Sequence, residues 1–204
     1  MHIAEGFLPP LHAAAWWVAS APFAVHGARA VITESRANPE SRLLLAAAGA
    51  TTFVLSAIKL PSITGSSSHP TGTGAGAILA GAPVMAFLGS LVLVMQALLL
   101  AHGGLTTLGA NVFSMAIAGP WAGYAFYRAL RHLHSPTAVF GAVAGANLAT
   151  YVVTALQLAL AHPDPVGGFP ASLGTFLAVF ALTQIPLALA EGIVGVLLLR
   201  YLAV

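Results

Sequence analysis

The stretch Ser66–Gly74 (SSSHPTGTG) decides how the chain folds, because it is small, polar and glycine-rich within an otherwise apolar sequence. It is not itself a hydrophobic, membrane-spanning segment, and it separates the hydrophobic segments on either side. Its one strong metal-binding side chain is His69, and a second histidine, His2, lies next to the free amino group of the chain. We expect these two segments to meet in the folded protein and to hold a transition-metal ion.

The composition indicates a membrane protein with one domain, residues 1–204. Hydrophobic residues make up 58% of the chain and charged residues only 6%, whereas a soluble globular domain carries about 25% charged residues. The alternating runs typical of a membrane β-barrel do not occur. A net charge of +2 from scattered residues does not indicate nucleic-acid binding, and the absence of cysteine leaves nitrogen to bind a soft metal.

Six hydrophobic blocks predict an all-α fold that crosses the membrane several times and contacts its lipid. The third block is interrupted at Gly81-Ala82-Pro83, and a proline breaks a helix because it removes a backbone hydrogen bond. Short or broken helices at membrane depth occur where they are buried in protein or line a polar cavity. The blocks are residues 11–32, 43–60, 77–101, 105–130, 137–161 and 173–199.

The basic residues predict the number of crossings, because cytoplasmic loops carry the excess of lysine and arginine. If the Arg29–Arg42 loop, the Arg128–Arg131 loop and Arg200 are all cytoplasmic, Met1 and His69 lie outside. The chain must then cross an odd number of times between His69 and the second basic loop. A break after the His69 loop supplies the additional helix. We therefore expect about seven transmembrane helices, one of them short or broken, and a cytoplasmic C-terminus.

Met1 and His2 together offer three nitrogens to a metal ion: the amine, the His2 backbone amide and the His2 imidazole. Residues 1–10 lack the basic start of a signal peptide, and a bulky second residue disfavours removal of Met1, so we expect Met1 to remain as the mature start. His69, in the loop of residues 61–76, is the fourth candidate donor. Four nitrogens in a square suit Ni(II) or Cu(II) and can hold low-spin Co(II). The alternatives are a disordered terminal His2 and a His69 with a helix-capping role.

Long motifs distributed over essentially the whole chain point to one known family. They are Met1–Ile3, Glu5–Pro9, Lys59–Ser62, Thr64–Ser66, Ser68–Gly74, Ala101–Asn111, Phe113–Ala116, Asp164–Phe169, Gln184–Ala188 and Glu191–Gly192. Together they resemble the CbiM/NikM family, the substrate-binding membrane components of energy-coupling-factor transporters for cobalt and nickel. The resemblance implies seven helices and a metal held by the Met1 amine, the His2 amide and imidazole, and the His69 imidazole.

The resemblance also implies a biological setting. It favours Co(II) as the transported substrate, with Ni(II) as the alternative, in a prokaryotic inner membrane and in the service of cobalamin biosynthesis. The implied partners are a transmembrane coupling (T) subunit, cytoplasmic ATPase subunits and a small accessory membrane subunit. The chain has no phosphate-binding G-x-x-x-x-G-K-[ST] motif, so we expect a transport component without enzymatic activity, whose partners hydrolyse ATP.

Two alternatives from other functional classes remain open. An intramembrane hydrolase would use one of Ser66–Ser68 as nucleophile and His69 or His102 as base, although no acid and no H-E-x-x-H motif accompanies them. A channel or proton-coupled carrier would use Glu191, the only carboxylate well inside a hydrophobic block.

Four residues are expected to support the metal site, and for His102 the alternatives are a relay of metal and a role in a turn or interface. Polar residues within the membrane should face protein, and Asn111 is therefore interpreted either as a brace for the metal-binding loops or as a contact between helices. His102 begins a glycine turn on the outer face, and we interpret it as a turn or interface residue. The supporting residues are Glu5, Lys59, Ser68 and Asn111.

Overall fold

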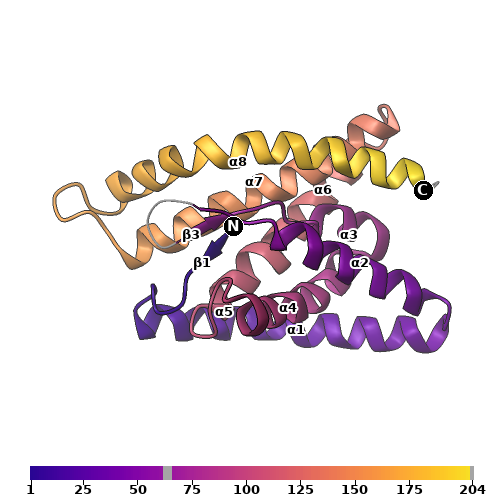
Figure 1. Ribbon diagram of the computed structural model, residues 1–204, viewed down its shortest axis with the longest axis horizontal. Coiled ribbons are helices and arrows are strands. Elements are labelled where there is room, and N and C mark those ends of the chain that lie inside the picture. The colour runs from indigo at the N-terminus through magenta and orange to yellow at the C-terminus, as the bar shows by residue number, and fades with distance from the viewer. Residues whose placement is uncertain (62–65, 203–204) are drawn as a thin grey trace.

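The computed structural model describes residues 1–61 and 66–202, which form a helical bundle with one small sheet (Figure 1). Three helical pieces, α5, η1 and α6, follow one another directly, so the described helices form seven rods. The elements are β1 (His2–Ile3), α1 (Pro10–Ala37), α2 (Ser41–Ala57), β2 (Leu60–Pro61), β3 (Ser66–Ser68), α3 (Thr73–Ala80), α4 (Ala82–Leu100), α5 (Leu108–Asn111), η1 (Val112–Ala118), α6 (Gly119–Leu130), α7 (Ser135–Ala161) and α8 (Gly168–Tyr201).

Three of the described helices have the length and composition of membrane-spanning segments. By length and composition, α4, α7 and α8 can each cross a bilayer among the described helices, and α2 is a shorter apolar helix of 17 residues. Large apolar side chains point outward, including Leu43 on α2, which is 80% exposed, and Leu182 on α8, which is 78% exposed. The expectation of an all-α fold with about seven helices is therefore confirmed.

The expected break after the His69 loop is present between α3 and α4. Helix α3 has only eight residues and ends at Gly81, whose φ of +88° takes the chain out of the helix. Glycine adopts this region without the steric cost of a side chain. Pro83 then lies in the first turn of α4, where its missing N–H would have no helical partner. The short helix and its break thus follow from local sequence.

Basic residues gather at one end of the bundle. Arg36, Arg128 and Arg200 each lie in the last turn of their helices, α1, α6 and α8. Figure 1 shows the α1–α2 connection, the α6–α7 connection and the C-terminus at one end of the molecule, and the α7–α8 connection at the other. The three basic segments therefore share an end, as the count of crossings requires.

The small sheet joins the N-terminus to the glycine-rich loop. Strand β3 lies in the middle, with β1 and β2 antiparallel on its two sides, and His2 is paired with Ser67. Met1 and Ile3 are completely buried in a core that includes Phe180 of α8. The N-terminal segment is thus a buried strand at the edge of the small sheet, and it places His2 close to His69.

Candidate metal centre

Three buried imidazoles, those of His2, His69 and His102, converge at the end of the small sheet. Their ring centroids lie 4.3 Å apart for His2 and His69, 4.3 Å for His2 and His102, and 4.9 Å for His69 and His102. Each ring has one nitrogen within 4.8 Å of a nitrogen of the others, and no ring is more than 2% exposed. Neutral imidazole nitrogen is a common ligand for divalent transition metals.

A hydrogen bond sets the direction of the His69 lone pair. The Nδ1–H of His69 donates to the carbonyl oxygen of Pro70 at 2.7 Å, which leaves Nε2 without a proton. That Nε2 faces Nδ1 of His2 in a very short contact. A metal-binding imidazole in proteins usually has its other nitrogen bonded in this way, because the bond fixes the tautomer and the ring orientation. His69 is therefore oriented as a ligand would be.

His102 belongs to the cluster, so our interpretation of it as a turn or interface residue was incomplete. Its Nε2 is 2.6 Å from Oγ of Ser67, while its buried Nδ1 has no hydrogen-bond partner among the described residues. A buried polar atom without a partner is costly, and a metal ion would supply one. The count of crossings already placed the His102 turn on the same face as His69, and that was the signal in the sequence.

The amino terminus lies in the same environment. Burial lowers the pKa of the Met1 amine from its ordinary 8.0 to about 5, although the negative charge of Glu191 acts in the opposite direction. Burial also lowers the pKa of His69, followed by the positive charges of that amine and of His102. The Met1 amine, His69 and His102 all lie outside the helices. The site keeps its nitrogens neutral, and neutral nitrogens can accept a cation.

The other two imidazoles are affected in the same way. Burial lowers the pKa of His2 well below its ordinary value, and the nearby His69, His102 and the amine lower it further, whereas Gln96 raises it. Burial, the amine and Lys59 lower the pKa of His102 to about 4. Since the charge of the amine affects the pKa of every histidine in the cluster, the Met1 nitrogen is within electrostatic reach of all three.

Asn111 fastens the strand that carries His2. Its Oδ1 accepts the N–H of Ile3 at 2.8 Å and its Nδ2 donates to the C=O of Ile3 at 3.0 Å. The hydroxyl of Thr107 donates to the same carbonyl at 2.9 Å. Asn111 ends α5, directly before the π-helix η1, and π-helical turns are rare and frequent at functional sites. Of the two interpretations of Asn111, the brace agrees with these contacts.

The other three expected supporting residues are Ser68, Glu5 and Lys59. Ser68 is buried, and its hydroxyl is 2.8 Å from the hydroxyl of Thr183 on α8. The carboxylate of Glu5 accepts the N–H of Thr106 at 3.2 Å at the surface, which ties the N-terminal segment to the α4–α5 connection. Lys59 is exposed and acts on the site through its charge. Part of the loop of residues 61–76, namely 62–65, lies outside the described residues.

Two alternative interpretations of the histidines are wrong. His2 is 1% exposed and lies in a paired strand, so it is not a disordered terminal residue. His69 does not cap the following helix, because the N-cap position of α3 is Gly72, without a side-chain cap. His162, another histidine of the same end, donates from Nε2 to the carbonyl of Phe7 and lies outside the cluster.

The contacts also bear on the hydrolase alternative. Ser67 and His102 form the hydrogen bond that a nucleophile and its base would share. In a catalytic triad, however, a third group orients the other nitrogen of the histidine, and Nδ1 of His102 has no such partner among the described residues. The pair therefore lacks the acid that activates a serine.

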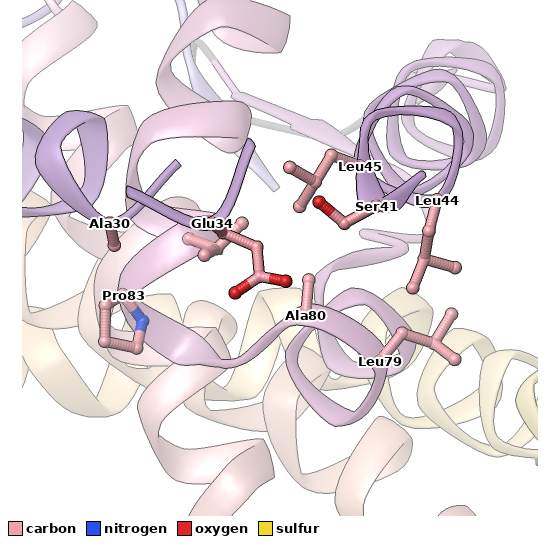
Figure 2. A pocket seen from close by; sticks show the side chains of 9 residues that line it. Ala30, Glu34, Ser41, Leu44, Leu45, Leu79, Ala80 and Pro83 are labelled. Atoms are coloured by element: carbon pink, nitrogen blue, oxygen red, sulfur yellow. The ribbon is translucent and has the colours of Figure 1, made fainter. Parts of the chain in front are cut away.

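A separate cavity opens at the far end of α3, and it is a poor metal site. It has a volume of about 420 Å³ and lies between α1, α2 and the α3–α4 break. Figure 2 shows that Glu34 is the acidic side chain in its wall, among mostly apolar neighbours such as Leu79 and Pro83. Glu34 already accepts a hydrogen bond from Asn38 at 3.0 Å. A single carboxylate offers far fewer donors than the histidine cluster.

The fold and this cluster define a polytopic membrane protein of the transition-metal transporter class. The chain is similar to a crystal structure of a truncated transition-metal transporter, with a TM-score of 0.87 at 27% sequence identity, covering 100% of this chain and 98% of that one. The model of the CbiM family, described as the cobalt uptake substrate-specific transmembrane region, matches residues 2–204. The chain belongs to the CbiM family.

Curated relatives agree with this assignment. The cobalt transport protein CbiM of Streptomyces coelicolor is 65% identical over 205 residues, covering 99% of this chain and 88% of the relative. The cobalt transport protein CbiM of Propionibacterium freudenreichii is 60% identical over 204 residues, covering 99% and 87%. The chain is therefore a multi-pass membrane component of a transporter and not an enzyme, which removes the hydrolase alternative.

Proposed function

We propose that the protein is the substrate-specific subunit of an energy-coupled importer and captures Co(II) at the end of the bundle where β1 and β3 meet. The observation that carries the proposal is the convergence of three buried, neutral imidazoles beside a buried amino terminus. Relatives that are 58–65% identical are named cobalt transport proteins. We carry this substrate over to the present chain.

The proposed ligands are the Met1 amine, the His2 amide and imidazole, and Nε2 of His69. The first three follow one another along the chain and form fused rings around one ion, and β3 brings the fourth donor to them. Nδ1 of His102 adds a nitrogen from the α4–α5 connection. Ser67 orients His102, and Asn111 holds Ile3 so that His2 stays in register.

The direction of transport follows from the charges. The basic ends of α1, α6 and α8 would face the cytoplasm. The metal centre and the N-terminus would then face the outside, where the ion is captured. Since the chain has no nucleotide-binding motif, a transmembrane coupling subunit, cytoplasmic ATPase subunits and a small accessory membrane subunit would supply the energy and complete the transporter.

Nickel is the competing substrate, because an all-nitrogen site binds Ni(II) more tightly than Co(II) in the usual affinity order of divalent metals. A cell could then select cobalt by metal supply. Titration of the purified, metal-free protein with Co(II) and Ni(II) in separate and competing experiments distinguishes the two. A Ni(II) preference that persists in competition, with uptake of nickel by cells, would assign the protein to nickel.

One variant tests the ligand set directly. A three-residue insertion, Leu-Ala-Ala, between Met1 and His2 keeps every histidine and the bulky second residue that retains Met1, but it places the imidazole too far along the chain to form adjoining chelate rings with the amine. A single inserted residue would not serve, because a histidine in third position still chelates together with the amine and two amides. We expect the parent protein to bind about one Co(II) and the insertion variant to lose this binding. Equal binding by both would exclude the amino terminus and leave His69 and His102 as the core of the site.

A further inference from the structure

Glu191 is a buried carboxylate on α8 that accepts hydrogen bonds from four donors. Oε2 accepts the N–H of Thr71 at 2.8 Å and Nδ2 of Asn147 at 2.6 Å. Oε1 accepts the hydroxyl of Thr71 at 2.8 Å and the N–H of Gly72 at 2.6 Å. Glu191 is 3% exposed. Its acceptor positions are therefore occupied by the protein itself, and three of the four donors belong to the residues that follow His69-Pro70.

These contacts lie directly before α3, which has no side-chain cap. Gly72 occupies the N-cap position of α3 and has no side chain to bind the free N–H groups of the first turn. An unsatisfied N–H at membrane depth is costly, because no water is there to bind it, and a negative group is favourable at the positive end of a helix. Glu191 accepts the N–H of Gly72 at this N-cap position and the N–H of Thr71 before it, from a helix that lies 119 to 120 residues further along the chain.

Helix α8 forms hydrogen bonds with residues on both sides of His69. Before the histidine, Ser68 contacts Thr183 of α8 through their hydroxyls at 2.8 Å. After it, Thr71 and Gly72 contact Glu191 of the same helix. The segment that contains His69 is thus hydrogen-bonded to α8 at two points. Helix α8 continues to the end of the bundle opposite the sheet (Figure 1).

We propose that Glu191 is a positioning residue for the metal centre: by holding Thr71 and Gly72, it keeps Nε2 of His69 in place and makes α8 the helix that moves His69 when the site opens. This inference rests on the proposed metal capture. A shift of α8 along its axis would carry Glu191 and Thr183 together and draw His69 away from His2. Retention of the ion and the position of α8 are thereby linked.

The first test is Glu191→Gln, which keeps the shape but places an amide NH₂ among groups that are themselves donors. We expect Co(II) affinity to fall about tenfold or more, the loss that goes with one broken hydrogen bond to a charged group. At saturation, the d–d absorption bands of Co(II) should differ from those of the parent protein, because a displaced His69 changes the ligand set. Parent-like affinity and bands would overturn the proposal. If the variant kept the affinity and bands of the parent but lost metal uptake in cells, Glu191 would instead act as a relay for protons or metal.

A milder pair of variants covers the case in which Glu191→Gln does not fold. Thr71→Val removes the hydroxyl bond to Glu191. Thr154→Val makes the same change at a buried threonine whose hydroxyl, among the described residues, bonds only to the carbonyl of Thr150 within α7. We expect weaker Co(II) binding for Thr71→Val and parent-like binding for Thr154→Val. Equal affinities in the two variants would overturn the positioning role.

A measurement without metal separates this inference from the proposed function. Amide hydrogen exchange on the metal-free parent should show protected N–H groups at Thr71 and Gly72, and Glu191→Gln should expose them to exchange. Unchanged protection of these N–H groups in the variant would overturn the proposal that Glu191 holds Thr71 and Gly72 in place. If the parent protein bound neither Co(II) nor Ni(II), the proposed function would fail, and the exchange result would still decide whether Glu191 holds the loop.

Discussion

The Asn111 side chain forms hydrogen bonds with both backbone polar groups of Ile3: its Oδ1 accepts the N–H, and its Nδ2 donates to the C=O. The two atoms lie on the same side of the extended strand, because N–H and C=O of one residue point the same way. The side chain therefore fixes both the position and the rotation of β1. Since His2 precedes Ile3 directly, the same contact determines where the His2 nitrogens point.

Replacement of Asn111 by alanine should weaken metal binding without removing a ligand. We expect Co(II) affinity to fall about 10- to 100-fold, the usual effect of losing a group that orients a metal ligand. Isothermal titration of the purified protein measures it. Asn38→Ala is the matched control, because that exposed asparagine bonds to Glu34 at the opposite end of α1. Parent-like affinity in Asn111→Ala would show that β1 holds its place without this contact.

His69→Ala should weaken Co(II) binding more than His102→Ala does. His69 contributes the nitrogen that faces Nδ1 of His2, and its loss should abolish stoichiometric binding. His102 approaches from the α4–α5 connection and leaves the chelate of Met1 and His2 intact. Its replacement by alanine should therefore leave a site weakened about 10- to 100-fold. Metal content after gel filtration, together with titration, compares them. An equally complete loss in both variants would make His102 an essential ligand.

Metal binding should release protons in a pattern set by the lowered pKa values. The Met1 amine, with a pKa of about 5, and the imidazoles are already neutral at pH 7, so only the His2 amide has a proton to lose. We expect about one proton released per Co(II) at pH 7 and an affinity that falls as pH falls, more steeply below about pH 5. An amine with its ordinary pKa of 8.0 would release a second proton.

Calorimetric titrations in buffers of different ionisation enthalpy count these protons. The insertion of Leu-Ala-Ala after Met1 is the control, since it disrupts the chelate but keeps the histidines. No proton release at pH 7 would remove the amide from the ligand set, and two would show that the amine is not held neutral in the metal-free protein.

Local features of the sequence predicted the helices and one pair of candidate ligands, but not how the candidate site is completed. The break at Gly81-Ala82-Pro83 is a property of neighbouring residues, so the short helix was predictable. His2 and His69 stand out because one adjoins the amine and the other interrupts an apolar sequence. Their meeting followed from the count of crossings, which needs only the distribution of charge.

The contacts that complete the site join residues far apart in the chain. Thr71 meets Glu191 across 120 residues, and Ile3 meets Asn111 across 108. Hydrophobic periodicity assigns a residue to a helix but does not say which buried polar groups on different helices will pair. Glu191 was therefore recognisable as an unusual intramembrane carboxylate, while its partners were not. His102 was underestimated for a similar reason, since its approach to His2 depends on the shape of a glycine turn.

The turn at Gly103 should be the position where the smallest change damages the metal centre. Its φ is +78°, and a Cβ there would lie 2.9 Å from Cδ2 of His2 and 3.1 Å from Nδ2 of Asn111. Gly103→Ala should therefore push the His102 turn away from His2 and weaken Co(II) binding about tenfold or more, in addition to a backbone strain of about 1–2 kcal/mol. Gly168→Ala, at φ +62° with its nearest neighbour 4.0 Å away, carries the same kind of strain far from the site and should bind Co(II) as the parent does. Titration and thermal unfolding of both variants separate strain from steric conflict, because matching losses of affinity would attribute the effect to backbone strain alone.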